Sequence, residues 1–134
     1  MHEIKYEGQE PFKKHEDDAG YDLFLQHDVN LIPGKVTTVN LEFKVEIPKG
    51  CMGILLPRGG SAKRGILVQI PPIDCGYSGD IHAMLFLAGD EPVFLEKGER
   101  VCQLVIVQPC TAEFVKGTVK PGDRGENRFN STGR

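Results

Sequence analysis

A chain of 134 residues has the size of one domain, with a hydrophobic fraction of 40% and a charged fraction of 26% that are ordinary for a globular protein. The formal net charge of −3 argues against a general nucleic-acid-binding protein, which is usually basic. No apolar run approaches the roughly 18 residues of a membrane span, and the start lacks a signal-peptide core. We therefore expect a cytoplasmic protein with neither nucleic acid nor a membrane as its partner.

Short strands are predicted along most of the chain. Sixteen glycines and nine prolines interrupt it and leave no room for a long helix. The clearest strand spans residues 39–47, where every second residue is apolar. Segments 81–87 and 101–107 are more uniformly apolar, so we expect central strands buried on both faces. Further elements are short strands at 51–56, 66–70 and 93–96 and one helical turn near 61–64.

Turn sequences at 48–50 and 96–99 connect these strands. The stretch before about Asp17 and the segment after about Gly117 look least tied to the core. This pattern predicts a single all-β domain over residues 1–134, built as a sandwich, jelly roll or barrel.

The cysteines and histidines lack the spacing of a metal site. The four cysteines contain no CxxC pair and the four histidines no HxxxH pair, so we do not expect zinc. In a reducing compartment the cysteines are free thiols. Cys102 lies inside an apolar strand and is expected in the core.

Two loops carry groups suited to a metal or a phosphate. Asp22 alternates with apolar neighbours after a small-residue turn, where a carboxylate can contact metal-bound water or simply satisfy the turn. Gly60 and Ser61 lie at the start of the predicted helical turn, where backbone N–H groups can form an anion-binding nest. Arg58 would add a charged fork; the alternative is a glycine-rich surface turn.

Two later positions also suggest chemistry. Asp74 follows an apolar stretch and two prolines, so we expect a partly desolvated carboxylate that can act as a general base. Tyr77, three residues on, is placed to lie over a ligand ring, although the segment also reads as a simple β-turn. Gln103 interrupts an apolar strand, so its side-chain amide needs a hydrogen-bond partner, either within the protein or on a ligand phosphate.

The last eleven residues combine the parts of a phosphate clamp. Arg124 offers a planar donor fork, and Phe129 offers a flat face on which a base can stack. Ser131 and Thr132 supply hydroxyls next to a glycine. The alternative is a disordered polar tail.

The order and spacing of these segments resemble the five motifs of the homotrimeric dUTP diphosphatase family. The matching segments are AGYDL (19–23), PRGGSAKRG (57–65), IDCGYSG (73–79), GERVCQL (98–104) and RGENRFNSTG (124–133). The compact spacing between the second and third motifs is most similar to that of retroviral and phage members.

The resemblance implies a jelly-roll or β-clip barrel subunit in a homotrimer, with the arm 117–134 completing a neighbouring subunit's site. It also implies hydrolysis of dUTP to dUMP and diphosphate with Mg²⁺ on the phosphates. Asp74 would deprotonate the attacking water, and Tyr77 would pack on the deoxyribose and exclude a 2′-hydroxyl. Asp22 would support metal-bound water. The other implied substrate-binding residues are Arg58, Gly60, Ser61, Gln69, Gln103, Arg124, Phe129, Ser131 and Thr132.

Three motifs differ from the family pattern. Gly59 replaces a serine that contacts the phosphates, and Pro71 and Pro72 lack the N–H groups with which the family reads uracil. Arg128 and Asn130 replace glycines in the fifth motif. We therefore expect slow hydrolysis or relaxed base specificity. The alternatives are a catalytically weakened nucleotide-binding or protein-interaction module and, with less support, the dCTP deaminase branch.

Overall fold

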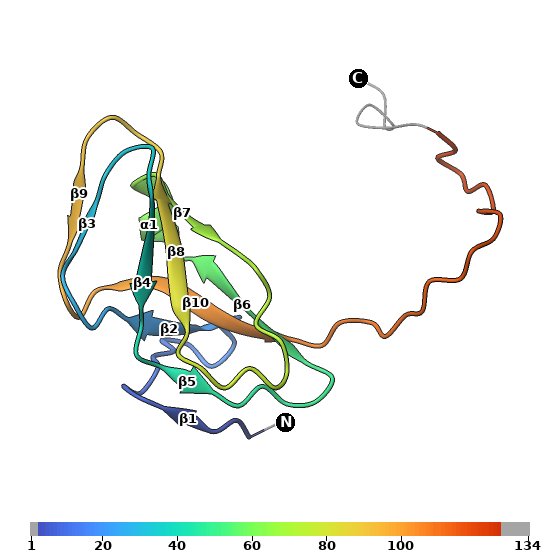
Figure 1. Cartoon of the computed structure of the whole chain (residues 1–134), viewed down its shortest axis with the longest axis horizontal. Helices are drawn as coiled ribbons and strands as arrows, with labels where there is room; N and C mark the ends of the chain where they lie inside the picture. Colours follow the sequence, from blue (N-terminus) through green and yellow to red (C-terminus); the bar gives the residue numbers. More distant parts are fainter. Residues whose placement is uncertain (1–2, 127–134) are drawn as a thin grey trace.

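The computed structural model describes residues 3–126, which form ten strands and one short helix (Figure 1). The elements are β1 (Tyr6–Glu7), β2 (Tyr21–Phe24), β3 (Val29–Leu31), β4 (Val36–Asn40), β5 (Lys44–Val45), β6 (Met52–Pro57), α1 (Gly59–Lys63), β7 (Ile66–Gln69), β8 (His82–Leu87), β9 (Val93–Leu95) and β10 (Arg100–Val107). The all-β prediction is confirmed, together with its short strands and the helical turn. No helix within residues 3–126 has the length and apolarity needed to cross a membrane.

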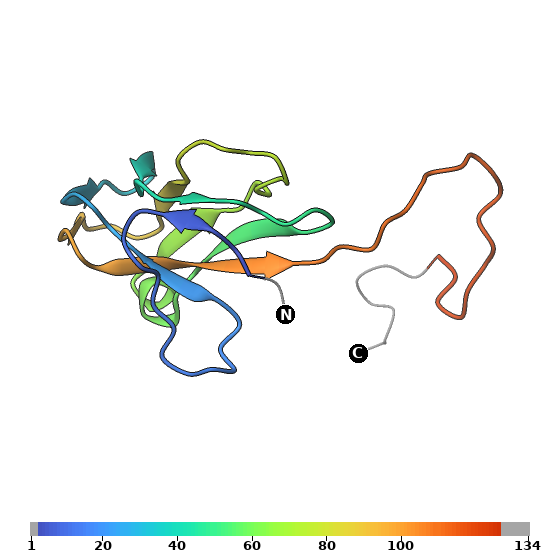
Figure 2. The ribbon, with the colours of Figure 1, turned by 90° about the horizontal axis from the view of Figure 1, so that it is seen from below.

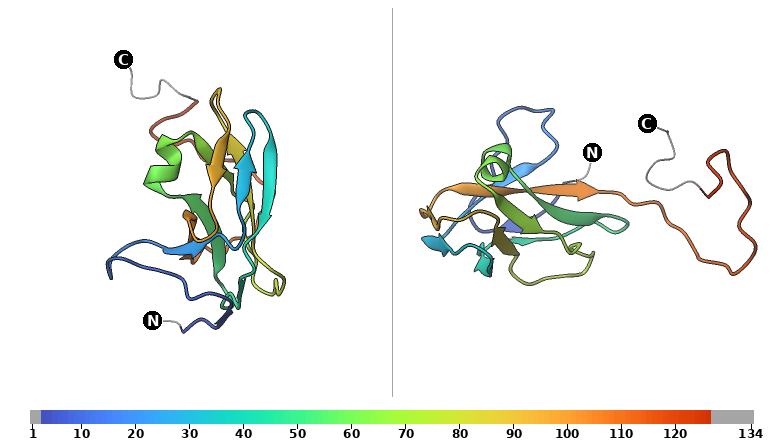
Figure 3. Two further views of the ribbon diagram at one scale, coloured as in Figure 1. Left: turned by 90° about the vertical axis from the view of Figure 1, so that its left-hand side faces the viewer. Right: turned by 90° about the horizontal axis from the view of Figure 1, so that it is seen from above.

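Two three-stranded antiparallel sheets form the body, in the orders β2-β10-β6 and β4-β8-β7. Two-stranded pairs add β1 to β5 and β3 to β9, and the β3–β9 ribbon lies at one end of the body (Figures 1 and 3). Side chains from both larger sheets join one apolar core. Ala83, Leu85 and Leu87 on β8, for example, are at most 1% exposed.

The prediction that strands β8 and β10 are central is confirmed, because each is the middle strand of its sheet. The prediction that both faces are buried is wrong for the single chain. On β8 the alternate residues Met84 and Phe86 are only half-buried. One face of this sheet therefore points outward and is apolar.

The predicted strand over 39–47 is interrupted. Its apolar residues are all buried, as the alternation requires, but the ladder stops at Asn40 and resumes at Lys44. Glu42 has a left-handed φ of 50°, and its N–H donates to Asn40 Oδ1 at 2.8 Å. This local hydrogen bond competes with the strand and redirects the chain from β8 toward β1.

The N-terminal stretch is more firmly attached than expected. β1 pairs with β5, and the Tyr6 ring stacks on Phe43 with a centroid separation of 5.6 Å. Phe12 forms an isolated antiparallel bridge with Asp22. These contacts join separate segments of the chain, so local patterning did not reveal them.

The segment after β10 leaves the body (Figures 1 and 2). Residues 108–126 contain no strand, and Phe114 is 103% exposed. Val115 and Val119 are also exposed. Three large apolar side chains in this segment therefore have no cover within the described part of the chain.

Candidate active site

The first, second and fourth sequence motifs meet in one sheet. Gln103 on the central strand β10 lies opposite Asp22 on β2 and Leu56 on β6. Arg58 follows β6 directly. Antiparallel pairing thus gathers residues that are far apart in the sequence.

Two arginines hold the Asp22 carboxylate. Arg58 Nε lies 3.0 Å from Asp22 Oδ2, and Arg100 Nη1 lies 3.4 Å from the same oxygen. Arg58 Nη1 also donates to the Arg100 carbonyl at 2.8 Å. The Asp22 side chain is 16% exposed, so water screens this cluster less than an open surface pair. In this structure Asp22 orients Arg58. The contact of Asp22 with metal-bound water stays a prediction.

Gln103 and Gly20 show how tightly the first motif packs on the fourth. Gln103 Nε2 donates to the Pro57 carbonyl at 3.3 Å, so the amide has a partner within the protein. A Cβ built on Gly20 would lie 2.8 Å from the Leu104 carbonyl oxygen and 2.9 Å from Gln103 Oε1. Only glycine allows this approach without displacing Gln103.

Cys102 is a core residue beside this cluster, as predicted. Burial, with a smaller contribution from the negative charge of Asp22, raises the pKa of Cys102 to about 12. All four cysteines are free. The Cys102 thiol therefore stays protonated and belongs to the packing rather than to the chemistry.

The turn after Arg58 leaves open space where the family pattern has a serine. α1 begins at Gly59, and Ser61 within it is 6% exposed. Apart from the adjacent residues and the helix's own backbone, no atom of the described chain lies within 4 Å of a Cβ built on Gly59 or Gly60. A side chain at either position would fit.

The third motif forms a turn fixed at both ends. Ile73 and Gly53 exchange two backbone hydrogen bonds of 2.7 and 2.9 Å, which fix the chain just before Asp74. The Tyr77 N–H donates to the Asp74 carbonyl at 3.1 Å, and the Tyr77 hydroxyl donates to the Asp80 carbonyl at 2.7 Å. The β-turn that the sequence offered as an alternative is present, and the tyrosine ring is held in place.

Asp74 is exposed in the single chain. The prediction that its carboxylate is partly desolvated is therefore wrong for the single chain. The preceding prolines, Pro71 and Pro72, are exposed as well and do not cover it. Asp74 nevertheless opens onto a pocket of about 220 Å³. That pocket is also lined by Gln69, Pro71, Pro72, Tyr77 and His82.

Two separate cavities each contain several of the predicted site residues. A cavity of about 380 Å³ contains Asp22, Arg58, Gly59, Arg100 and Gln103, and it shares no lining residue with the pocket at Asp74. We call the first one the phosphate cavity, because Arg58, Arg100 and Gln103 line it with two guanidinium groups and an amide around the Asp22 carboxylate.

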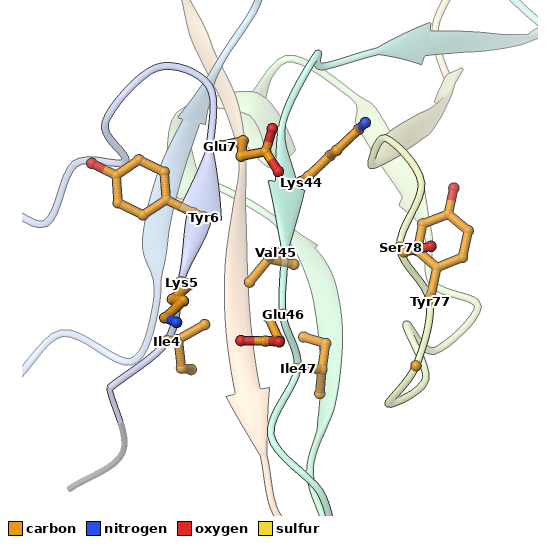
Figure 4. Close-up of a pocket in the computed structure, with 11 residues that line it drawn as sticks. Ile4, Lys5, Tyr6, Glu7, Lys44, Val45, Glu46, Ile47, Tyr77 and Ser78 are labelled. Atoms are coloured by element: carbon orange, nitrogen blue, oxygen red, sulfur yellow. The ribbon is translucent and has the colours of Figure 1, made fainter.

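A larger groove of about 710 Å³ lies between β1, β5 and the loop that carries Tyr77. Figure 4 shows Tyr77 and Ser78 on one side of Val45 and Ile47, with Tyr6 on the other. Of the predicted site residues between positions 3 and 126, only Tyr77 lines this groove. It is therefore a weaker candidate for the reaction site.

Sequence reasoning missed the contribution of the N-terminal loop. Phe12, Lys13 and Lys14 line the phosphate cavity. Arg100 lies over the Phe12 ring, with its guanidinium carbon 4.4 Å from the centroid. Adjacent lysines were the only signal, and lysines are mostly exposed on any protein.

The fifth motif is largely outside the described residues. Arg124 is exposed in a turn that the Gly125 N–H closes onto the Gly122 carbonyl at 3.1 Å. The predicted ligands Phe129, Ser131 and Thr132 lie outside residues 3–126. The altered positions 128 and 130 also lie outside that range.

A family model described as dUTPase matches residues 7–133. The chain belongs to the dUTPase family. It is 37% identical over 129 residues to a deoxyuridine 5′-triphosphate nucleotidohydrolase of Gloeobacter violaceus, covering 92% of this chain and 88% of the relative. The corresponding enzyme of Clostridium novyi is 38% identical over 128 residues, covering 92% and 89%.

Solved structures agree with this assignment. The dUTPase of Staphylococcus bacteriophage 80alpha, solved with dUPNHPP, superposes with a TM-score of 0.86 at 26% identity and covers 100% of both chains. The dUTPase-like jelly-roll fold and the family expected from the motifs are confirmed.

Proposed function

We propose that the protein hydrolyses dUTP to dUMP and diphosphate. The observation that carries the proposal is the cluster of Arg58, Arg100 and Gln103 around Asp22 in one cavity. Fixed cations and amide donors of this kind stabilise the charge of a triphosphate. Family membership, and relatives named for dUTP hydrolysis, support the same substrate.

The reaction adds water across the bond between the α- and β-phosphates. Asp74 takes a proton from the attacking water, and Tyr77 packs on the deoxyribose, where a 2′-hydroxyl has no room. Gln69 lies beside the base. Arg58, Gly60, Ser61, Gln103 and Arg124 bind the phosphates, while Phe129, with Ser131 and Thr132, closes over the nucleotide as a stacking platform.

Mg²⁺ fits the residues as an ion bound mainly through the substrate. Residues 3–126 contain no group of three His, Cys, Asp or Glu side chains that could hold a metal unaided. Mg²⁺ usually keeps several waters and binds one or two carboxylates plus substrate phosphates. Asp22 would be the carboxylate that holds such waters, and the ion would neutralise charge on the phosphates.

We further propose a homotrimer in which subunits share each site and the arm 117–134 reaches a neighbour. Two observations support this proposal. The phosphate cavity and the pocket at Asp74 are separate in the single chain, and the outer face of β4-β8-β7 is apolar. Across it, Val36 and Leu67 flank Phe86 in register and are 49% and 50% exposed. Light scattering should give about three times the 14.8 kDa chain mass; a monomer at micromolar concentration would contradict shared sites.

A weakened nucleotide-binding relative is the second candidate. Gly59 lacks a hydroxyl, and Pro71 and Pro72 line the pocket at Asp74 without N–H groups to offer a base. A site with fewer polar groups discriminates less between bases. Turnover of dUTP, dCTP and dTTP by the unmodified protein separates this candidate from an efficient, specific hydrolase.

Asp74→Asn tests the enzyme proposal directly. Loss of a general base should lower dUTP turnover by about 10²–10⁴, while binding of dUPNHPP persists because the phosphate cavity is unchanged. Asp90→Asn, at an exposed carboxylate away from both cavities, is the matched control. Unchanged turnover in Asp74→Asn would remove this residue from the mechanism. Binding of dUPNHPP without any turnover by the unmodified protein would favour the second candidate.

A further inference from the structure

We propose that the N-terminal loop completes the phosphate cavity and that Lys14 binds substrate phosphates. This role lies outside the five family motifs. The identity of the substrate rests on the function proposed above, whereas the attraction for phosphate follows from the cavity itself.

The loop is fixed against the site. The Phe12 N–H donates to the Asp22 carbonyl at 3.0 Å, and the Asp22 N–H donates to the Phe12 carbonyl at 2.7 Å. Arg100 stacks on the Phe12 ring, so the loop contacts the same arginine that pairs with Asp22. Farther along, the His15 N–H donates to Asp18 Oδ2 at 2.9 Å and closes a turn. Lys14 therefore projects from a backbone tied to the first motif.

The charges of the cavity leave Lys14 available. The lining cations are Lys13, Lys14, Arg58 and Arg100, and the lining carboxylates are Asp18 and Asp22. Both arginines already pair with Asp22. The Lys13 ammonium lies 4.5 Å from the Tyr21 ring centroid and donates to the Glu16 carbonyl at 3.4 Å.

Lys14 makes no hydrogen bond or ion pair with any residue between 3 and 126. Cations outnumber carboxylates in the cavity, so it attracts a polyanion. An ammonium is a compact point charge that suits a phosphate oxygen. All N–H donors of the Lys14 ammonium are free of contacts within residues 3–126, whereas both arginines spend part of their donors on Asp22.

The test measures binding of inorganic tripolyphosphate by calorimetry and KM for dUTP, using the full chain. Lys14→Gln should weaken both about two- to fivefold, the range for one solvent-exposed charge contact. The loss of affinity should be smaller in 1 M salt, where the Debye length is only about 3 Å and charge–charge attraction is strongly screened. Lys14→Arg should retain the affinity. Deoxyuridine, which has no phosphate, should bind equally well to all variants.

Lys35→Gln is the matched control, because Lys35 is an exposed lysine that lines neither cavity. Unchanged tripolyphosphate affinity and KM in Lys14→Gln would overturn the proposal, as would an equal loss in Lys35→Gln. If the unmodified protein binds tripolyphosphate through Lys14 but does not hydrolyse dUTP, the Lys14 proposal stands and the proposed function fails.

Discussion

Asp22→Asn separates two roles that one carboxylate can play. In the structure, Asp22 Oδ2 accepts contacts from both Arg58 and Arg100. Family resemblance gives the same residue a role at metal-bound water. The substitution keeps the shape of the side chain and removes its charge. It therefore weakens the arginine contacts and any metal contact together, and the assay must tell them apart.

The structural effect can be estimated from the contacts. A hydrogen bond to a charged group contributes about 1.5–3 kcal/mol when shielded, but Arg58 is 35% exposed and Arg100 is 31% exposed. Solvent screening reduces the value toward that of a surface pair, so we expect a loss of about 1–2 kcal/mol. For a domain of this size that lowers Tm by roughly 3–10 °C.

The deciding measurement is tripolyphosphate binding with Mg²⁺ and again with EDTA. If Asp22 acts by orienting Arg58, Asp22→Asn weakens binding in both conditions. If Asp22 acts only through metal-bound water, the defect disappears in EDTA. A variant with unchanged Tm and unchanged binding in EDTA would refute the orienting role. Asp90→Asn again controls for the loss of one negative charge.

Other variants probe single features of the site. Gly59→Ser should raise kcat for dUTP if the missing donor limits the rate, because the position has open space. Gly79→Ala should lower turnover with little change in Tm, since its Cβ would lie 2.7 Å from the Tyr77 hydroxyl and displace the ring; unchanged kinetics would show that the ring position is unimportant. At pH 8, mass spectrometry should find Cys102 unmodified by iodoacetamide until the protein unfolds, because its pKa is raised to about 12. Truncation after Gly122 should leave a folded protein without turnover, and an active truncated protein would return the tail to a passive role.

Period-two alternation predicted burial better than it predicted hydrogen bonding. Val39, Leu41 and Phe43 are buried as the pattern required, because side-chain direction follows the pleat. The ladder still breaks at Glu42, where Asn40 captures a backbone N–H. Such local competition depends on the geometry of one side chain, which a pattern of apolar positions does not contain.

The motifs supplied the candidate residues but not their partners. Arg58 and Asp22 were both predicted to serve the substrate, and their ion pair was not predicted. The contribution of Phe12 was missed, since its bridge to Asp22 joins two irregularly spaced positions. Contacts of this kind come from tertiary packing, and neither composition nor periodicity records them.

The position of Asp74 in the single chain supports the proposal of a shared site. Expelling water from a closed site strengthens its electrostatic interactions, yet Asp74 is exposed in the single chain and lies in a pocket apart from the phosphate cavity. The apolar outer face of β4-β8-β7 and the apolar side chains near Phe114 are likewise exposed and have no packing partner within residues 3–126. Packing of further copies would cover those surfaces and bring one chain's Asp74 toward another chain's Arg58. The shared site and the exposed apolar surfaces would then have one cause, the assembly of the protein.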